Sequence, residues 1–239
     1  GITGSLLVLL KDALNPNMIQ TLENNAIFVH GGPFANIAHG CNSILATKMA
    51  LKLSDYVVTE AGFGADLGAE KFLDIKCREA GLNPSLVVMV ATIKALKYHG
   101  GMNLKNLKEE NVEALARGIE NLGKHIDTIK KFGINTVIAI NKFHTDSEAE
   151  IEFITKWAEE RGIAISLSEV FAKGGEGGID LANKVVANID ENTKYTPLYD
   201  LSDPICDKIY KIASKAYGAK EIIYSDAVKE KIAEYQNTE

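Results

Sequence analysis

Long apolar runs and an excess of basic residues are both missing from this sequence of 239 residues. The best apolar runs, such as Leu86–Ala91, have the length of a β-strand and are too short to cross a bilayer. No membrane-spanning segment is therefore expected. The formal net charge is −6, which argues against nucleic acid as a partner because phosphate binding relies on Lys and Arg.

Cysteine is also scarce, and its spacing excludes two classes of protein. Cys41, Cys77 and Cys206 are odd in number and far apart, so neither a disulfide framework nor a zinc site is expected. His30 and His39 lie near Cys41, but without a second Cys/His pair a structural role is more frequent than a metal site. The N-terminus has no basic region and no cleavage site of small residues. Reduced thiols and the absence of a signal peptide predict a cytoplasmic protein.

Three motifs that would identify a nucleotide-binding or hydrolytic enzyme are absent. There is no phosphate loop of the pattern Gly-x-x-x-x-Gly-Lys-[Ser/Thr], because no lysine follows the glycines of Gly174–Gly178. The glycines of residues 62–68 miss the Rossmann spacing by one residue. His30 and the two glycines after it are similar to an esterase oxyanion loop, but no Gly-x-Ser-x-Gly elbow accompanies them.

What the sequence does contain is an alternation of short apolar runs with segments of helical length. The runs are Ala26–His30, Tyr56–Thr59, Leu86–Ala91, Thr136–Ile140 and Ala164–Ser168. The helical segments are Asn42–Leu53, Ala69–Ala80, Glu109–Phe132 and Ser147–Arg161. Near-continuous apolar strands that alternate with helices predict an α/β fold, in which a mostly parallel sheet carries helices on both faces.

Capping residues support these helix boundaries. Ser147 with Glu150 is typical of a helix N-terminus, because each side chain can accept a hydrogen bond from the backbone of the other. Gly81, Gly133 and Gly162 stand where a helix ends in a left-handed residue.

The last forty or so residues differ from the rest. Asp203–Tyr217 and Ser225–Tyr235 are typical of amphipathic helices, joined through Gly218 and a short apolar stretch. We expect residues 1–195 to form the α/β core, and residues 196–239 to form a C-terminal helical segment that leads into a region outside this sequence.

Glycines, basic residues and aromatic residues follow the predicted strands at their carboxyl ends. In an open parallel sheet, ligands bind at this edge because the loops leave backbone groups free. The loops are His30–Ser43, Glu60–Gly68, Thr92–Gly101, Asn141–Asp146 and Glu169–Gly178. Such loops suit a ligand that combines anionic groups with a flat ring.

Each loop also has a purely structural interpretation. Glycine after a strand most often makes a tight turn, and Asp66 is a possible helix cap as well as part of a phosphate-facing loop. Asn141 either ends a strand or reads a base edge through its amide. Phe143 and Phe171 either belong to the core or clamp a flat heterocycle.

Two long segments resemble signatures of the formate–tetrahydrofolate ligases, also called formyltetrahydrofolate synthetases. One is Phe28–Ser43 and the other is Asp55–Phe72; runs this idiosyncratic are far more specific than a glycine pattern. The resemblance continues through Lys76–Arg78, Ala95–Gly101, Asn141–Phe143 and Ala172–Gly178. It covers essentially the whole chain, whereas the chain covers less than half of a family member.

The resemblance implies a P-loop NTPase-like α/β core whose phosphate-loop unit is not in this sequence. It implies that ATP phosphorylates formate, and that N10 of tetrahydrofolate then attacks formyl phosphate to give 10-formyltetrahydrofolate. Mg²⁺, a monovalent cation and a homo-oligomer, usually a tetramer, are implied as well. A chain that starts at Gly1 and lacks the phosphate loop is typical of a fragment, so we expect no turnover by the chain alone. The alternative is a non-catalytic pterin- or nucleotide-binding module, or an assembly domain.

The resemblance also implies roles for particular residues. Phe143 matches the family aromatic on one side of the pterin ring. Phe171 stands where many members have Trp on the other side, which reduces the stacking area. Phe63, Gly64 and Asp66 match the loop that faces the nucleotide and the intermediate. Asn141 and Thr92 are further nucleotide-facing candidates, and the supporting candidates are His30, Glu60, Lys97 and His99. No catalytic residue and no metal ligand is assigned.

Overall fold

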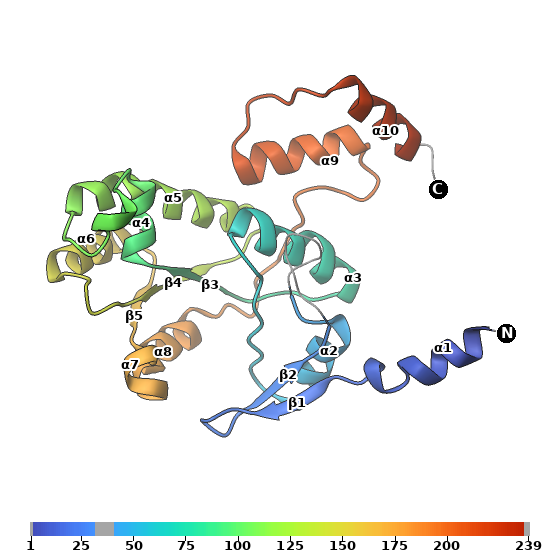
Figure 1. Cartoon of the computed structure of the whole chain (residues 1–239), viewed down its shortest axis with the longest axis horizontal. Coiled ribbons are helices and arrows are strands. Elements are labelled where there is room, and N and C mark those ends of the chain that lie inside the picture. The colour runs from blue at the N-terminus through green and yellow to red at the C-terminus, as the bar shows by residue number, and fades with distance from the viewer. Residues whose placement is uncertain (1, 32–40, 237–239) are drawn as a thin grey trace. The chain divides into compact units, whose positions relative to one another are not determined.

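In the computed structural model, the chain divides after Leu82 into an N-terminal unit, Gly1–Leu82, and a sheet unit, Asn83–Glu239 (Figure 1). The structure describes residues 2–31 and 41–236. Residue 195, where the sequence placed a boundary, lies within the sheet unit. Each unit is therefore described by itself.

The sheet unit contains a three-stranded parallel sheet of order β3-β4-β5. β3 (Val87–Ala91) pairs with β4 (Thr136–Asn141), and β4 pairs with β5 (Ile165–Ser168). Parallel neighbours cannot be joined by a tight turn, so helices connect them. These are α4 (Ile93–His99), η4 (Leu104–Asn106), α5 (Val112–Lys130) and α6 (Glu148–Glu159). The predicted α/β class is confirmed, and three of the five predicted strands lie in this parallel sheet.

Helices lie against both faces of this sheet. Successive residues of a strand point to opposite faces, and both sets of β4 side chains are buried. Ile138 and Ile140 belong to the core cluster that includes side chains of α4, α5 and α6, whereas Val137 and Ala139 are buried outside that cluster. After β5, the chain forms the short helices α7 (Val170–Lys173) and η5 (Gly174–Gly178). Helix α8 (Ile179–Asn188) then packs on β4 and β5 from the side opposite α5 and α6 (Figure 1).

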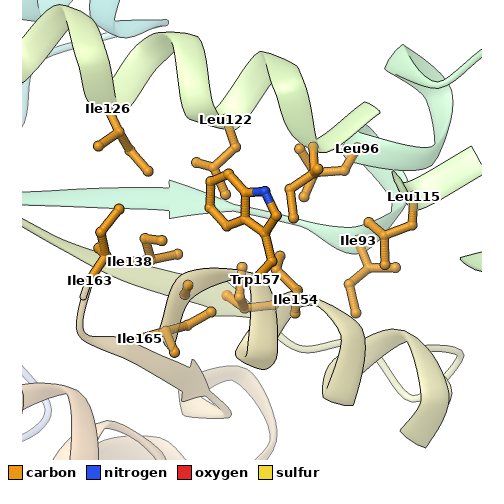
Figure 2. Close-up of a cluster of buried hydrophobic side chains, with 13 residues drawn as sticks. Ile93, Leu96, Leu115, Leu122, Ile126, Ile138, Ile154, Trp157, Ile163 and Ile165 are labelled. Carbon is orange, nitrogen blue, oxygen red and sulfur yellow. The ribbon is translucent and has the colours of Figure 1, made fainter. Parts of the chain in front are cut away.

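The core of the sheet unit lies between the sheet and helices α4, α5 and α6. Trp157 of α6 lies between Leu122 of α5 and the isoleucines of the sheet, as Figure 2 shows. Burying one such aliphatic side chain contributes about 1.5–3 kcal/mol. The labelled members are Ile93, Leu96, Leu115, Leu122, Ile126, Ile138, Ile154, Trp157, Ile163 and Ile165.

A buried ion pair joins the three helices of this layer. Lys97 Nζ of α4 lies 2.8 Å from Glu150 Oε1 of α6, and both side chains are fully buried. Lys97 also donates to the backbone carbonyl of Glu109 (2.7 Å). Glu150 accepts from the backbone N–H of Asn111, the N-cap of α5 (2.9 Å). The loop before α5 is thereby tied to both neighbouring helices.

Glu150 also completes the predicted capping box of α6. Its Oε2 accepts from the backbone N–H of Ser147 (3.1 Å), and the Ser147 hydroxyl accepts from the backbone N–H of Glu150 (3.3 Å). Burial raises the pKa of Glu150, but the hydrogen bonds from Lys97, Asn111 and Ser147 outweigh it and hold that pKa below its usual value. Glu150 is therefore a charged hub at the start of α6.

The C-terminal segment forms α9 (Ile205–Ile212), η6 (Ala213–Tyr217) and α10 (Asp226–Gln236). Helices occur in both regions where the sequence predicts them. Lys131 Nζ and Lys124 Nζ donate to the carbonyl of Lys215 (2.6 and 3.3 Å), and the Thr128 hydroxyl donates to the carbonyl of Ala216 (3.2 Å). These bonds fix η6 to α5.

The N-terminal unit has a different architecture, built on an antiparallel hairpin. β1 (Asn17–Gln20) pairs with β2 (Ala26–Val29). The helices of the unit are α1 (Ile2–Leu10), η1 (Asp12–Leu14), α2 (Ile44–Leu53), the wider π-type turns η2 (Ala65–Ala69) and η3 (Phe72–Cys77), and α3 (Arg78–Ala80). In the described part of the chain, every helix is either too short or too polar to span a membrane.

Of the two strands predicted in this unit, one forms outside the parallel sheet and the other does not form. The run Ala26–His30 contains a strand, but its partner is β1, so it does not extend the parallel sheet. A tight turn closes that hairpin, with Asn24 in the left-handed region (φ 61°). Tyr56–Thr59 forms no strand in the structure, and Val58 is 92% exposed. An apolar run becomes a strand only where a partner strand accepts its hydrogen bonds.

Replacing Glu150 by Ala is expected to lower the free energy of unfolding by about 3–5 kcal/mol, because Lys97 would remain buried without its counterion. Denaturant unfolding followed by circular dichroism measures this. Glu152→Ala on the same helix is the matched control, since Glu152 forms only an exposed pair with Lys156, worth less than about 0.5 kcal/mol. Equal losses in the two variants would contradict the role given to the buried pair.

Candidate functional site

The strand register brings three loops to one edge of the parallel sheet. Ala91 of β3 pairs with Ile140 of β4, and Ile140 pairs with Leu167 of β5. The strands therefore end at the same level, and the residues after them share the carboxyl edge. This edge is where parallel sheets bind ligands. It contains the loops that start at Thr92, Asn141 and Glu169.

Phe143 lies in a closed turn after β4. Its backbone N–H donates to Asp146 Oδ2 (2.8 Å), and the backbone N–H of Asp146 donates to the Phe143 carbonyl (3.0 Å). Lys94 of α4 places its Nζ 4.1 Å from the centroid of the Phe143 ring. The Phe143 residue is nevertheless 41% exposed. It is therefore not a core side chain, and part of its ring is available to a ligand.

Phe171 lies after β5, in the first turn of α7, and is fully exposed. The loop around it depends on glycine. Gly174, which ends α7, has φ 62° and ψ −147°, a conformation that only glycine adopts readily. A Cβ on Gly177 would lie 2.4 Å from the backbone carbon of Glu169, so the chain can return close to β5 only without a side chain there. An exposed phenylalanine on a glycine-shaped loop has no packing role in this unit.

A carboxylate and two lysines lie just beyond the carboxyl ends of β4 and β5. Glu169 Oε2 is 2.7 Å from Lys173 Nζ, and its Oε1 is 3.4 Å from Lys142 Nζ. The hydrogen bond from Lys173 is the main reason why the pKa of Glu169 lies below its ordinary value. The pairs link the Phe143 loop to the Phe171 loop, since Lys142 precedes Phe143.

The remaining candidates of the sheet unit have mixed environments. Thr92 is the N-cap of α4, where its hydroxyl accepts from the Ala95 N–H (3.1 Å). Asn141 is exposed at the end of β4, and His99 is exposed in the last turn of α4. Lys97 requires a correction: its ammonium is fully buried and bonded to Glu150 and to the Glu109 carbonyl. It supports the fold and does not face a ligand.

In the N-terminal unit, Phe63 occupies a strained backbone position. Its φ is 65°, which is rare for a bulky residue, and its side chain is 73% exposed. Gly64 precedes η2, and its carbonyl accepts from the N–H groups of Leu67 and Gly68 (3.1 and 2.9 Å). A Cβ on Gly68 would lie 1.5 Å from the Gly62 carbonyl oxygen. The glycines therefore fold this loop back on itself and hold Phe63 outward.

Asp66 and Glu60 flank the same region. Asp66 lies in the first turn of η2 and is half-buried, whereas Glu60 is exposed. Acidic side chains in a first turn stabilise the start of a helix, so the position of Asp66 agrees with a role in starting η2. Contact of Asp66 with a ligand stays a prediction.

His30 is held within the N-terminal unit through both ring nitrogens. Nδ1 lies 2.7 Å from the Ser43 hydroxyl, and Nε2 lies 2.9 Å from the Ala13 carbonyl. Ser43 is the N-cap of α2, and Asn42 binds the backbone of both His30 and Phe28 (3.0 and 2.7 Å). These signature residues therefore join β2 to α2. His39 and the rest of the segment 32–40 lie outside the described residues.

A buried polar cluster in the N-terminal unit was not predicted from the sequence. Lys76 is 2% exposed, donates to the Thr47 hydroxyl (2.8 Å) and lies 5.2 Å from the centroid of the Phe72 ring. Burial lowers the pKa of Lys76 and raises that of Cys77 to about 12. Two thiols near Lys76, Cys41 and Cys77, are both buried. Cys41, Phe72, Lys76 and Cys77 lie in three separate segments of the family resemblance, and Thr47 lies outside them. Nothing in the spacing of these residues shows that they meet.

A family model described as formate–tetrahydrofolate ligase matches residues 1–239. The chain belongs to this family. Membership fits the exposed aromatic residues, because a ligase that acts on tetrahydrofolate must hold a flat ring. It also agrees with the resemblance found in the sequence, which covers the same range.

Residues outside the predicted set also contribute to the carboxyl edge of the sheet. Lys94 and Asp146 contact Phe143 directly, although neither residue was assigned a role in the site from the sequence. In a parallel sheet, residues that lie the same number of positions beyond two paired strands meet at one edge. This rule would have brought Lys94 and Phe143 together, but it requires knowing that β3 pairs with β4, which the sequence alone does not show.

The buried Glu70 carboxyl should make the stability of the N-terminal unit depend on pH. Burial, together with the nearby Asp74 carboxylate, raises the pKa of Glu70 from its ordinary value of 4.5 to about 8. Between these values the folded state keeps a proton that the unfolded state releases. The free energy of unfolding should therefore fall as pH rises from about 5 to about 8, and level off above that.

Glu70→Gln cannot ionise, so this pH slope should be absent in the variant. Denaturant unfolding at several pH values measures it, with the exposed Glu23→Gln as the control that keeps the slope. A Glu70→Gln variant with the original slope would show that another group is responsible.

Proposed function

We propose that this chain contributes tetrahydrofolate-binding loops to an enzyme that joins formate to tetrahydrofolate with ATP. Family membership supports this class of reaction. The observation that carries the proposal is the pair of exposed phenylalanines on adjacent loops at the carboxyl edge of the parallel sheet, Phe143 after β4 and Phe171 after β5. An exposed aromatic ring offers a flat face on which a pterin ring can stack.

The loops are proposed to contact different parts of the substrates. Phe143 and Phe171 contact the pterin ring, and Asn141 and Thr92 lie at the same edge, where they face the nucleotide or the intermediate. In the N-terminal unit, Phe63 and Gly64 carry the nucleotide-facing role, supported by the strained backbone that turns Phe63 outward. Asp66 and Glu60 line the same loop. His99 is a supporting residue of the sheet unit, and His30 supports the N-terminal unit through its two hydrogen bonds.

The proposal includes the course of the reaction. ATP phosphorylates formate, and N10 of tetrahydrofolate attacks the resulting formyl phosphate, which yields 10-formyltetrahydrofolate and phosphate. Enzymes accelerate such transfers by positioning the reactants and neutralising phosphoryl charge. We further propose that the enzyme uses Mg²⁺ and a monovalent cation, assembles as a tetramer and is located in the cytoplasm. The described residues include no group of three or more His, Cys, Asp or Glu side chains placed to hold a metal ion, so they assign no ligand to either cation.

Phe143→Ala is expected to raise the dissociation constant for tetrahydrofolate about five-fold, since a stacked aromatic face is worth about 1 kcal/mol. Isothermal titration calorimetry of the chain measures this, and the folate KM of the natural protein that carries the chain should rise in parallel. Tyr210→Ala is the control, because Tyr210 is an exposed aromatic on α9. If the chain is folded and binds no tetrahydrofolate, the ring contact proposed for Phe143 is wrong.

A formyl-transfer assay with ATP, formate and tetrahydrofolate separates the enzyme from its alternative, a pterin-binding module. We expect binding without turnover from the 239 residues alone, because the sequence has no phosphate loop to hold the triphosphate. The natural protein that carries the chain should give 10-formyltetrahydrofolate. Turnover by the 239 residues would contradict the first expectation, and its absence in the natural protein would favour the module.

A further inference from the structure

The Phe143 ring has a cationic neighbour that none of the roles above uses. Lys94 lies in the first turn of α4, and its Nζ stands 4.1 Å from the ring centroid. The register explains the contact: Ala91 pairs with Ile140, and the two residues lie three positions beyond these partners. A cation at this distance is attracted by the negative face of an aromatic ring.

The same loop is fixed from a second direction. Asp146 Oδ2 accepts from the backbone N–H of Phe143 (2.8 Å), and the backbone N–H of Asp146 donates to the Phe143 carbonyl (3.0 Å). Ser147 follows directly and begins the capping box of α6. The backbone of Phe143 is therefore held by the start of α6, and one face of its ring is held by α4.

We propose that Lys94 is a positioning residue for the flat ring of the substrate. Its ammonium closes one face of Phe143, so a ligand ring can stack only on the face that remains open. This inference rests on the proposed function, because it assumes that Phe143 stacks on tetrahydrofolate. It goes further in naming a residue that acts through Phe143 and makes no contact of its own with the ligand.

Lys94 differs from the neighbouring lysine of the same helix. Lys97, one turn further along, is fully buried and paired with Glu150. Lys94 is only half-buried, and its ammonium lies over the Phe143 ring. Replacing Lys94 should therefore disturb the orientation of Phe143 without unfolding the sheet unit.

The test is a double-mutant cycle on tetrahydrofolate binding, measured by calorimetry. Lys94→Met keeps the length of the side chain and loses the charge, and should raise the dissociation constant about two- to five-fold. Lys94→Arg retains a cation over the ring and should stay within about two-fold of the unchanged protein. In a Phe143→Ala background, Lys94→Met should have no further effect. Lys105→Met, on the exposed surface of η4, is the matched control.

Three results would overturn the inference. An unchanged dissociation constant in Lys94→Met would show that the ammonium does not orient the ring. An equal loss with and without Phe143 would show that Lys94 binds the ligand directly. A fall in the thermal midpoint that accounts for the lost affinity would show a structural role. If Phe143→Ala itself leaves binding unchanged, the proposed function fails instead, and the two failures are thereby distinguished.

Discussion

A lysine ammonium and a glutamate carboxylate that are both removed from water must satisfy each other, because neither is tolerated in the interior alone. Lys97 and Glu150 meet this requirement at 2.8 Å, and the leftover hydrogen-bonding capacity of both groups is taken by backbone atoms at the starts of α5 and α6. The pair therefore sets where α6 begins. Since α6 begins directly after the Phe143 turn, the position of the exposed ring depends on a contact that lies entirely inside the protein.

The structure distinguishes two groups of residues that both lie in segments of the family resemblance. His30, Asn42 and Ser43 belong to a segment typical of the ligase family, yet their described contacts join β2 to α2. Phe143 and Phe171 occupy shorter and less distinctive segments, and they are the ones presented to solvent. A polar residue in a signature can thus hold a loop together without contacting a ligand. Exposed aromatic side chains at the carboxyl edge of the sheet are therefore the better candidates for ligand contact.

Local rules predicted much of the sheet unit. The apolar runs at Leu86–Ala91, Thr136–Ile140 and Ala164–Ser168 became strands, and the capping box at Ser147 formed as expected, because each depends on residues close in sequence. Gly133 has the expected left-handed conformation (φ 78°). Long-range features escaped prediction, since the pairing of β1 with β2 and the approach of Lys94 to Phe143 depend on which segments meet. The predicted strand at Tyr56–Thr59 failed for the same reason.

Phe143 is proposed to stack on the ring of tetrahydrofolate at the carboxyl edge of the sheet. NMR spectra of the chain with labelled phenylalanine rings test this stacking most directly, with the buried Phe132 as an internal reference. On addition of tetrahydrofolate, the ring signals of Phe143 and Phe171 should move through the ring current of the pterin and show Overhauser contacts to its protons, while Phe132 stays unchanged. Bound tetrahydrofolate that leaves the Phe143 signals in place would contradict the account.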